Sequence, residues 1–147
     1  MSNSFEHYAA VENMYSQIVS PVCAKHDLTY MEFTVLMFLA NNPQYNTATE
    51  IVKYRHLTKS HVSISVRSLQ ERGLLSGEFR ERDRRTIHLC VLEQAKPVIT
   101  DGIAAQKKFR QVLFAGFTDE EQALMTKFME RINQNIELHT KKNNKGE

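Results

Sequence analysis

The sequence predicts a mainly α-helical fold with one small β-hairpin. Most apolar residues recur at the three- and four-residue spacing of amphipathic helices. Capping-box pairs, in which a Thr precedes a Glu by three residues, mark three helix starts. Residues 86–92 instead alternate apolar and polar side chains, which is the period of a strand. With 147 residues, 41% of them hydrophobic and 24% charged, the chain fits one domain with helical extensions.

The first two helices are predicted from apolar spacing and a cap. The first helix is predicted over about residues 5–25, in which apolar residues between positions 11 and 22 follow helical spacing. Pro21 within it predicts a kink or a break, because proline has no N–H to donate. Thr29 and Glu32 form the capping box of the second helix, which is too apolar for a surface helix and is expected to be buried. Residues 41–43, Asn-Asn-Pro, end it.

A helix-turn-helix is predicted next. Thr47 and Glu50 open a short third helix. Thr58 caps a fourth helix, and Gly73 follows it, where a positive φ costs glycine little. Two capped helices separated by a tight turn at residues 56–57 make a helix-turn-helix.

A β-hairpin with an arginine-rich tip is predicted over residues 74–92. The charged run 80–85 forms the tip, and residues 86–92 return as a strand. Asp83 is interpreted as an ion-pair partner that orients one of the neighbouring arginines. A helix-turn-helix followed by such a hairpin is a winged helix-turn-helix domain.

The rest of the chain predicts two more helices and a tail. A long helix begins near Glu93, with Pro97 in its first turn, and Thr118 and Glu121 open the last helix. The terminal helices carry more apolar surface than one small winged domain can cover, which favours a homodimer formed through them. The predicted parts are an N-terminal helix for dimerisation (1–28), the winged helix-turn-helix domain (29–92), C-terminal dimerisation helices (93–139) and a disordered tail (140–147).

Positive charge is concentrated in the middle of the chain. The formal net charge is only +2. Between Lys53 and His88, however, nine Lys and Arg face four Asp and Glu, so this stretch carries +5 and the remainder −3. A basic middle with mildly acidic ends indicates that one face of the protein meets a polyanion.

The fourth helix and the hairpin tip are the predicted DNA-binding surface. With Val62, Val66 and Leu69 turned inward, the helix presents a short, lightly basic face that suits the major groove of DNA, although a solvated amphipathic helix would look similar. Ile64 on that face would be out of place unless it contacted a thymine methyl group or a neighbouring side chain. Clustered arginines suit a negative minor groove. The candidate residues are Thr58, Lys59, Ser60, His61, Ser63, Ile64, Arg67, Arg80, Arg82, Arg84 and Arg85.

Three segments resemble the MarR family of winged helix-turn-helix transcriptional regulators. They are LTYMEFTVLMFL, LTKSHVSISVRSLQERGLL and the wing RERDRRTIHLCVL, within residues 19–97. The resemblance implies DNA contacts by Ser60, His61 and Ser63 and by the wing arginines 82, 84 and 85. The family often has Arg where this chain has Ile64.

The resemblance also implies a mechanism. It predicts an obligate homodimer that binds a palindromic operator in double-stranded DNA and acts as a ligand-responsive repressor. The effector would be a small aromatic or phenolic molecule between the DNA-binding lobe and the dimer helices, with His26 and Tyr30 as candidate pocket residues. No cofactor is expected.

The cysteines and histidines could indicate a redox sensor or a metal site instead. Peroxide-sensing members of the family carry a cysteine early in the first helix, a place that falls near Phe5 here. Cys23 is interpreted as a small buried residue and Cys90 as structural. Cys23 and His26 could supply half a metal site, but no second pair completes it, so no metal is expected.

The sequence lacks the motifs that would indicate catalysis, secretion or a membrane span. It contains no Gly-rich phosphate loop, no GxSxG and no HExxH, so we expect no catalytic activity. No CxxC pair, secretory signal or long apolar run occurs, which favours a cytoplasmic protein without membrane contact. A winged helix that binds other proteins instead of DNA is the alternative function.

Overall fold

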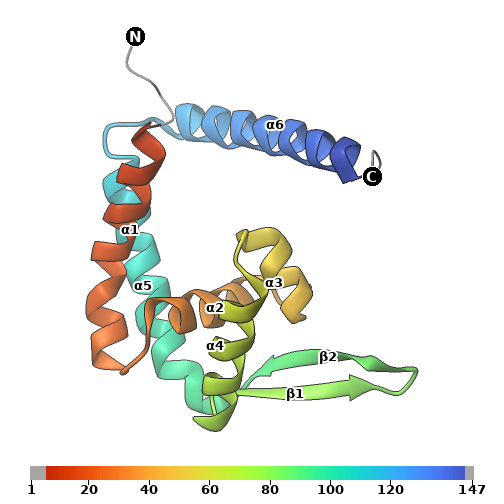
Figure 1. Cartoon of the computed structure of the whole chain (residues 1–147). Coiled ribbons are helices and arrows are strands. Elements are labelled where there is room, and N and C mark those ends of the chain that lie inside the picture. The colour runs from red at the N-terminus through yellow and green to blue at the C-terminus, as the bar shows by residue number, and fades with distance from the viewer. Residues whose placement is uncertain (1–5, 145–147) are drawn as a thin grey trace. The chain divides into compact units, whose positions relative to one another are not determined.

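The computed structural model describes residues 6–144, in which six α-helices and a short 3₁₀ helix accompany one two-stranded antiparallel sheet (Figure 1). This arrangement confirms the mainly α-helical class with a hairpin wing. The chain divides into two compact units with the boundary after Phe109. In order, the elements are α1 (Glu6–Lys25), α2 (Tyr30–Asn41), α3 (Ala48–Arg55), α4 (Lys59–Glu71), β1 (Leu75–Arg80), β2 (Asp83–Val91), η1 (Glu93–Ala95), α5 (Lys96–Leu113) and α6 (Asp119–Asn144).

The predicted helix starts are confirmed by their caps. Thr29 and Thr47 each accept a hydrogen bond from the amide of a Glu three residues on, and each Glu carboxylate returns to the cap amide. Thr58 Oγ1 accepts from the amide of His61 at 3.4 Å. α4 ends as predicted, with Gly73 at φ +72° after the C-cap Arg72.

Proline does not interrupt the first helix. α1 continues through Pro21 to Lys25, so the predicted break is absent. Pro21 and Gln17, four residues earlier, are both exposed, so water can hydrate the carbonyl that loses its helical donor at the proline. The predicted start at Phe5 lies outside the described residues.

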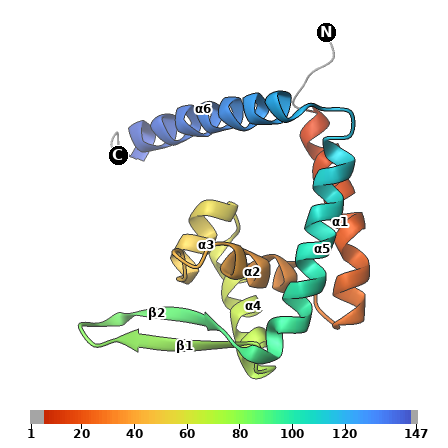
Figure 2. The ribbon, with the colours of Figure 1, turned by 180° about the vertical axis from the view of Figure 1, so that it is seen from behind.

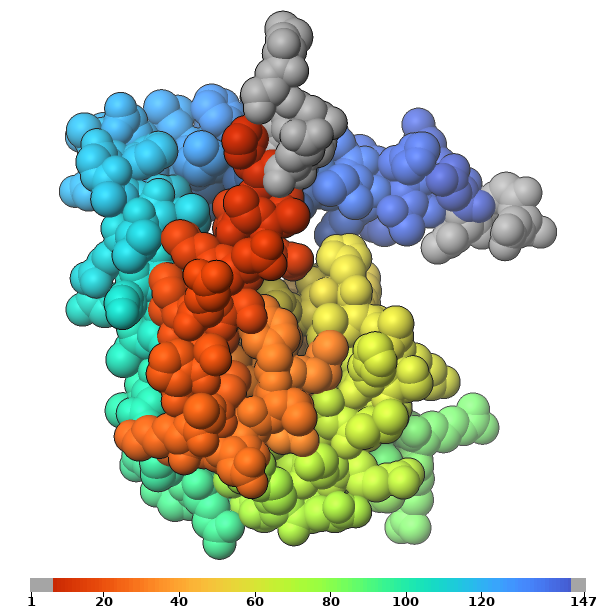
Figure 3. All heavy atoms as spheres, turned by 60° about the vertical axis from the view of Figure 1, so that its left-hand side comes forward, coloured from red at the N-terminus to blue at the C-terminus, as the bar shows by residue number. Residues whose placement is uncertain are grey.

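Two apolar clusters hold the first unit together. The larger lies among α2, α3, α4 and the base of the hairpin, and includes Leu36, Ile51 and Leu69. The smaller joins α1, α2 and α5. Figure 2 agrees with Figure 1 in placing α1 and α5 side by side, and Figure 3 shows α1, in red to deep orange, next to α2 and turquoise α5. Residues 33–39 of α2 are all buried, as the sequence predicts.

A glycine allows α5 to approach α2 closely. Gly102 is buried, and a Cβ atom built on it would lie 2.5 Å from Met37 Sδ and 3.1 Å from Phe33 Cε2. Any larger side chain would therefore displace the buried Met37 or separate the two helices.

The second strand of the hairpin is longer than the sequence predicts. β1 pairs antiparallel with β2 from Leu75↔Val91 to Arg80↔Asp83, with a register shift beyond the Phe79↔Ile87 pair. The second strand therefore begins at Asp83 rather than at Thr86, because its charged residues extend the strand instead of forming a longer loop. In both ribbon views the hairpin projects from the C-terminal end of α4 (Figures 1 and 2).

The second unit contains the end of α5 and the whole of α6. Thr118 and Glu121 form the predicted capping box. α6 runs to Asn144, so the disorder predicted from residue 140 is wrong for residues 140–144. Lys141 and Lys142 in the last turn suit the negative end of the helix dipole. Residues 145–147 lie outside the described part. Within residues 6–144, no helix is long and apolar enough to cross a bilayer.

Candidate nucleic-acid interface

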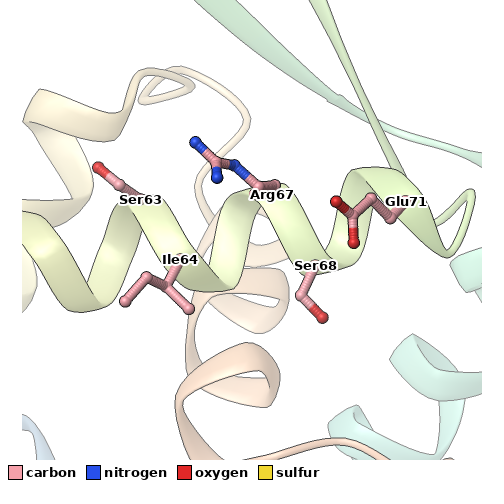
Figure 4. Close-up of a pocket in the computed structure, with 5 residues that line it drawn as sticks. All are labelled: Ser63, Ile64, Arg67, Ser68 and Glu71. Carbon is pink, nitrogen blue, oxygen red and sulfur yellow. The ribbon is translucent and has the colours of Figure 1, made fainter.

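The predicted residues of α4 share one outward face. Lys59, Ser60, His61, Ser63, Ile64 and Arg67 are exposed, as is the cap Thr58, whereas Val62, Ser65 and Leu69 are buried. In the close-up, Ser63 and Arg67 point toward the side on which the strands run, and Ile64 and Ser68 point the other way (Figure 4). A shallow hollow on this face is lined by Ser63, Ile64, Arg67, Ser68 and Glu71.

The four predicted arginines of the wing are also exposed. Arg80 ends β1, Arg82 lies in the turn, and Arg84 and Arg85 lie in β2. Within the described part of the chain, none of their side chains forms an ion pair. Four guanidinium groups are therefore available to an external polyanion.

Asp83 has a different role from the one predicted. Its Oδ1 accepts a hydrogen bond from the backbone N–H of Arg85 at 2.9 Å, and no arginine side chain pairs with it among the described residues. That bond, followed by one from the Thr86 hydroxyl, lowers the pKa of the Asp83 carboxyl. The aspartate shapes the turn by the short-range bonding for which Asp favours turns, and leaves the guanidinium groups unpaired.

The base of the wing is fixed to the loop before α3. The amide of Leu89 donates to the carbonyl of Asn46 at 2.7 Å, and His88 Nδ1 lies 2.7 Å from Asn46 Oδ1. Asn46 and His88 thus position the wing relative to the helix-turn-helix. The sequence alone does not indicate this role for either residue, because their contact spans 42 positions.

The C-terminal end of α4 is fixed to the corner between α1 and α2. Arg72 donates to the carbonyls of Asp27 at 2.7 Å and His26 at 2.8 Å. Its guanidinium also lies 3.6 Å from Glu32, which accepts a hydrogen bond from Ser68 at 2.9 Å. Arg72 is one of the nine cations of the basic segment, but its guanidinium donates hydrogen bonds to the backbone of the protein itself.

Arg72→Ala is expected to lower the free energy of unfolding by about 1–2 kcal/mol, since two carbonyl partners at the corner lose a charged donor. Thermal or urea denaturation measures this change. Arg72→Lys is the matched control, because it keeps the charge but cannot hold both carbonyls in a planar fork. Full stability of the lysine variant would contradict the role assigned to the fork.

The two candidate pocket residues have different partners. His26 Nε2 lies 2.7 Å from Asp101 Oδ2, which also accepts a hydrogen bond from Lys25 at 2.8 Å. Tyr30 packs edge-on against Tyr15 at 6.4 Å between ring centroids. The ring of Tyr15 also packs edge-on against Phe109, at 5.0 Å between ring centroids. The side-chain amide of Gln106 donates a hydrogen bond to the Tyr15 hydroxyl at 2.9 Å. The structure places His26 in an ionic contact and Tyr30 beside an aromatic cluster.

The contact between α1 and α5 at Asp101 predicts a pH dependence. The bond from Lys25, and then that from His26, lower the pKa of Asp101. The stabilisation is therefore complete above the ordinary aspartate pKa of about 3.9 and is lost as pH falls through the depressed value. Melting temperatures of the wild type and Asp101→Asn are expected to differ at neutral pH and to converge below about pH 4. A constant difference down to the lowest pH would contradict this assignment.

The cysteines differ in burial. Cys23 is buried in the cluster of α1, α2 and α5, as interpreted from the sequence, and burial raises the pKa of its thiol. Cys90 is half-buried on β2, and its pKa is also raised, chiefly by burial. Raised values disfavour the reactive thiolate. Among the described residues, no group of three or more His, Cys, Asp or Glu side chains is placed to hold a metal ion.

Known proteins share both the sequence pattern and the fold. The sequence model of the MarR family matches residues 26–86, which hold the helix-turn-helix and most of the wing. This segment of the chain is therefore similar to the MarR family. A curated relative, the transcriptional regulator ZitR of Lactococcus lactis subsp. cremoris, is 26% identical over 121 residues, or 80% of this chain and 82% of ZitR.

Solved MarR-family structures show the same fold. A putative MarR family regulator from Listeria monocytogenes, complexed with 26mer DNA, superposes with a TM-score of 0.83 at 17% identity, covering 92% of this chain and 90% of that one. BpsR of Bordetella bronchiseptica, whose DNA binding is described as regulated by 6-hydroxynicotinic acid, gives 0.68 at 17% identity, covering 89% and 99%.

Proposed function

We propose that this chain is a transcriptional regulator of the MarR family that binds double-stranded DNA as a homodimer in the cytoplasm. α4 enters the major groove, and the wing arginines reach the adjacent minor groove. The observation that carries this proposal is the exposed polar face of α4 on the same domain as four arginines without ion-pair partners in the described chain. The DNA complex of the Listeria relative supports it.

Exposed apolar surface supports the homodimer. In α6 the side chains of Leu124, Phe128, Ile132 and Ile136 are between 42% and 50% exposed. Their spacing of four residues makes one continuous apolar stripe on the helix. Burial of such a stripe against a second copy would remove it from water, and a two-fold dimer would present two α4 helices to a palindromic operator.

Repression that responds to a small aromatic or phenolic effector is the regulatory part of the proposal. The effector reported for BpsR, an aromatic acid, supports it. Tyr30 is the better placed of the two pocket candidates, since its exposed ring adjoins the ring of Tyr15. His26 already contacts Asp101 through its Nε2.

Selection from a pool of random DNA duplexes tests the proposed function. The full-length chain is expected to enrich a palindrome whose half-sites lie about 10 base pairs apart, since two recognition helices of a dimer span one helical turn. Footprinting of the enriched duplex should protect the major groove of each half-site. Failure to enrich any duplex would overturn the proposal.

A further inference from the structure

Ile64 is an apolar side chain on a face of α4 that is otherwise polar. It is 68% exposed, the largest value among the large apolar side chains that the structure describes. Scattered apolar residues are normal on protein surfaces. Ile64, however, lies within the outward face of α4, at the hollow that Ser63, Arg67 and Ser68 also line (Figure 4). At that exposure no side chain of residues 6–144 covers Ile64. Of the two explanations for an isoleucine on this face, contact with a thymine methyl group therefore remains.

The neighbours of Ile64 make it the most protruding apolar group of this face. Ser60, Ser63 and Ser68 have short side chains, so the helix backbone can approach a flat surface closely. Ile64 extends beyond these three serines, so it is the apolar group of this face that would meet such a surface. Its methyl groups can donate and accept no hydrogen bond, so a polar base edge pressed against them would lose its water without compensation.

The major groove offers one apolar group for such a contact. The base edges there present donors and acceptors, and only thymine adds a methyl group, at C5. We infer that Ile64 contacts the 5-methyl group of a thymine in each half-site and so selects a T·A pair at that position. This inference rests on the proposed function, because it requires α4 to lie in the major groove.

Deoxyuridine tests the inference, because it differs from thymidine only by that methyl group. The probe is the duplex obtained by selection, resynthesised with deoxyuridine at one thymine at a time and at symmetric pairs. One buried methyl group corresponds to about a fourfold change in affinity, and the two half-sites together to about fifteenfold. The wild type should show this loss at one symmetric pair of thymines.

Two variants link the methyl group to Ile64. Ile64→Ala should bind the thymidine and deoxyuridine duplexes equally well at that pair, whereas Ile64→Val should keep most of the difference. Both variants should fold, because the side chain is largely exposed. Thymine sensitivity that persists in Ile64→Ala, or a wild type that binds DNA without any sensitive thymine, would overturn the inference and leave DNA binding intact. A wild type that binds no duplex would overturn the proposed function, and the inference with it.

Discussion

Replacing Arg84 and Arg85 together with alanine is expected to weaken DNA binding by roughly tenfold to a hundredfold near 0.1 M salt, whatever the sequence of the duplex. Both side chains are exposed and have no ion-pair partner among the described residues. Each guanidinium that neutralises a phosphate releases counterions, so the slope of log K against log salt should become shallower by about 0.9 per lost contact. Fluorescence anisotropy at several salt concentrations measures both quantities.

A charge-matched variant separates the wing from general electrostatics. Lys107 and Lys108 are adjacent, exposed cations on α5, outside α4 and the wing. Their double alanine variant removes the same charge and is expected to change affinity much less. Equal losses in the two double variants would show that net charge, rather than the wing, carries the effect.

Gly102→Leu is expected to destabilise the first unit by about 2–3 kcal/mol, even though leucine favours a helix more than glycine does. The new side chain would occupy the space of Met37 and Phe33, both of which are buried. Urea denaturation measures the loss.

Ala104→Leu provides the control on the same helix. Ala104 is exposed two residues further along α5, so the same side chain there should leave the free energy of unfolding nearly unchanged. If both leucine variants lost stability equally, close packing at Gly102 would not be the cause.

Local signals explain which parts of the fold the sequence predicts well. A capping box involves residues three positions apart, so Thr29, Thr47 and Thr118 reveal helix starts without any knowledge of tertiary structure. Gly73 works in the same way, because its positive φ is a property of one residue. The exposure of the predicted residues of α4 also follows from a local period, since inward Val62 and Leu69 fix the opposite face.

Tertiary contacts explain what the sequence does not predict. Arg72 and Asn46 bond partners more than 40 positions away, and nothing in their local pattern distinguishes them from surface residues. The arginines that flank Asp83 predict an arginine partner for it, but its carboxylate instead accepts a hydrogen bond from a backbone amide two residues on. At the C-terminus, polar composition predicts disorder from residue 140, whereas continuation of α6 costs little once the preceding turns are formed.

The dependence of DNA affinity on salt tests most directly whether α4 and the wing bind duplex DNA. With about four to eight phosphate contacts, the dissociation constant for the selected duplex should rise by about a hundredfold to ten-thousandfold between about 50 and 200 mM salt. A protein-binding winged helix would use apolar area, which salt in this range affects little. A dissociation constant that changes by less than about threefold over that range would contradict recognition of the phosphate backbone by this surface.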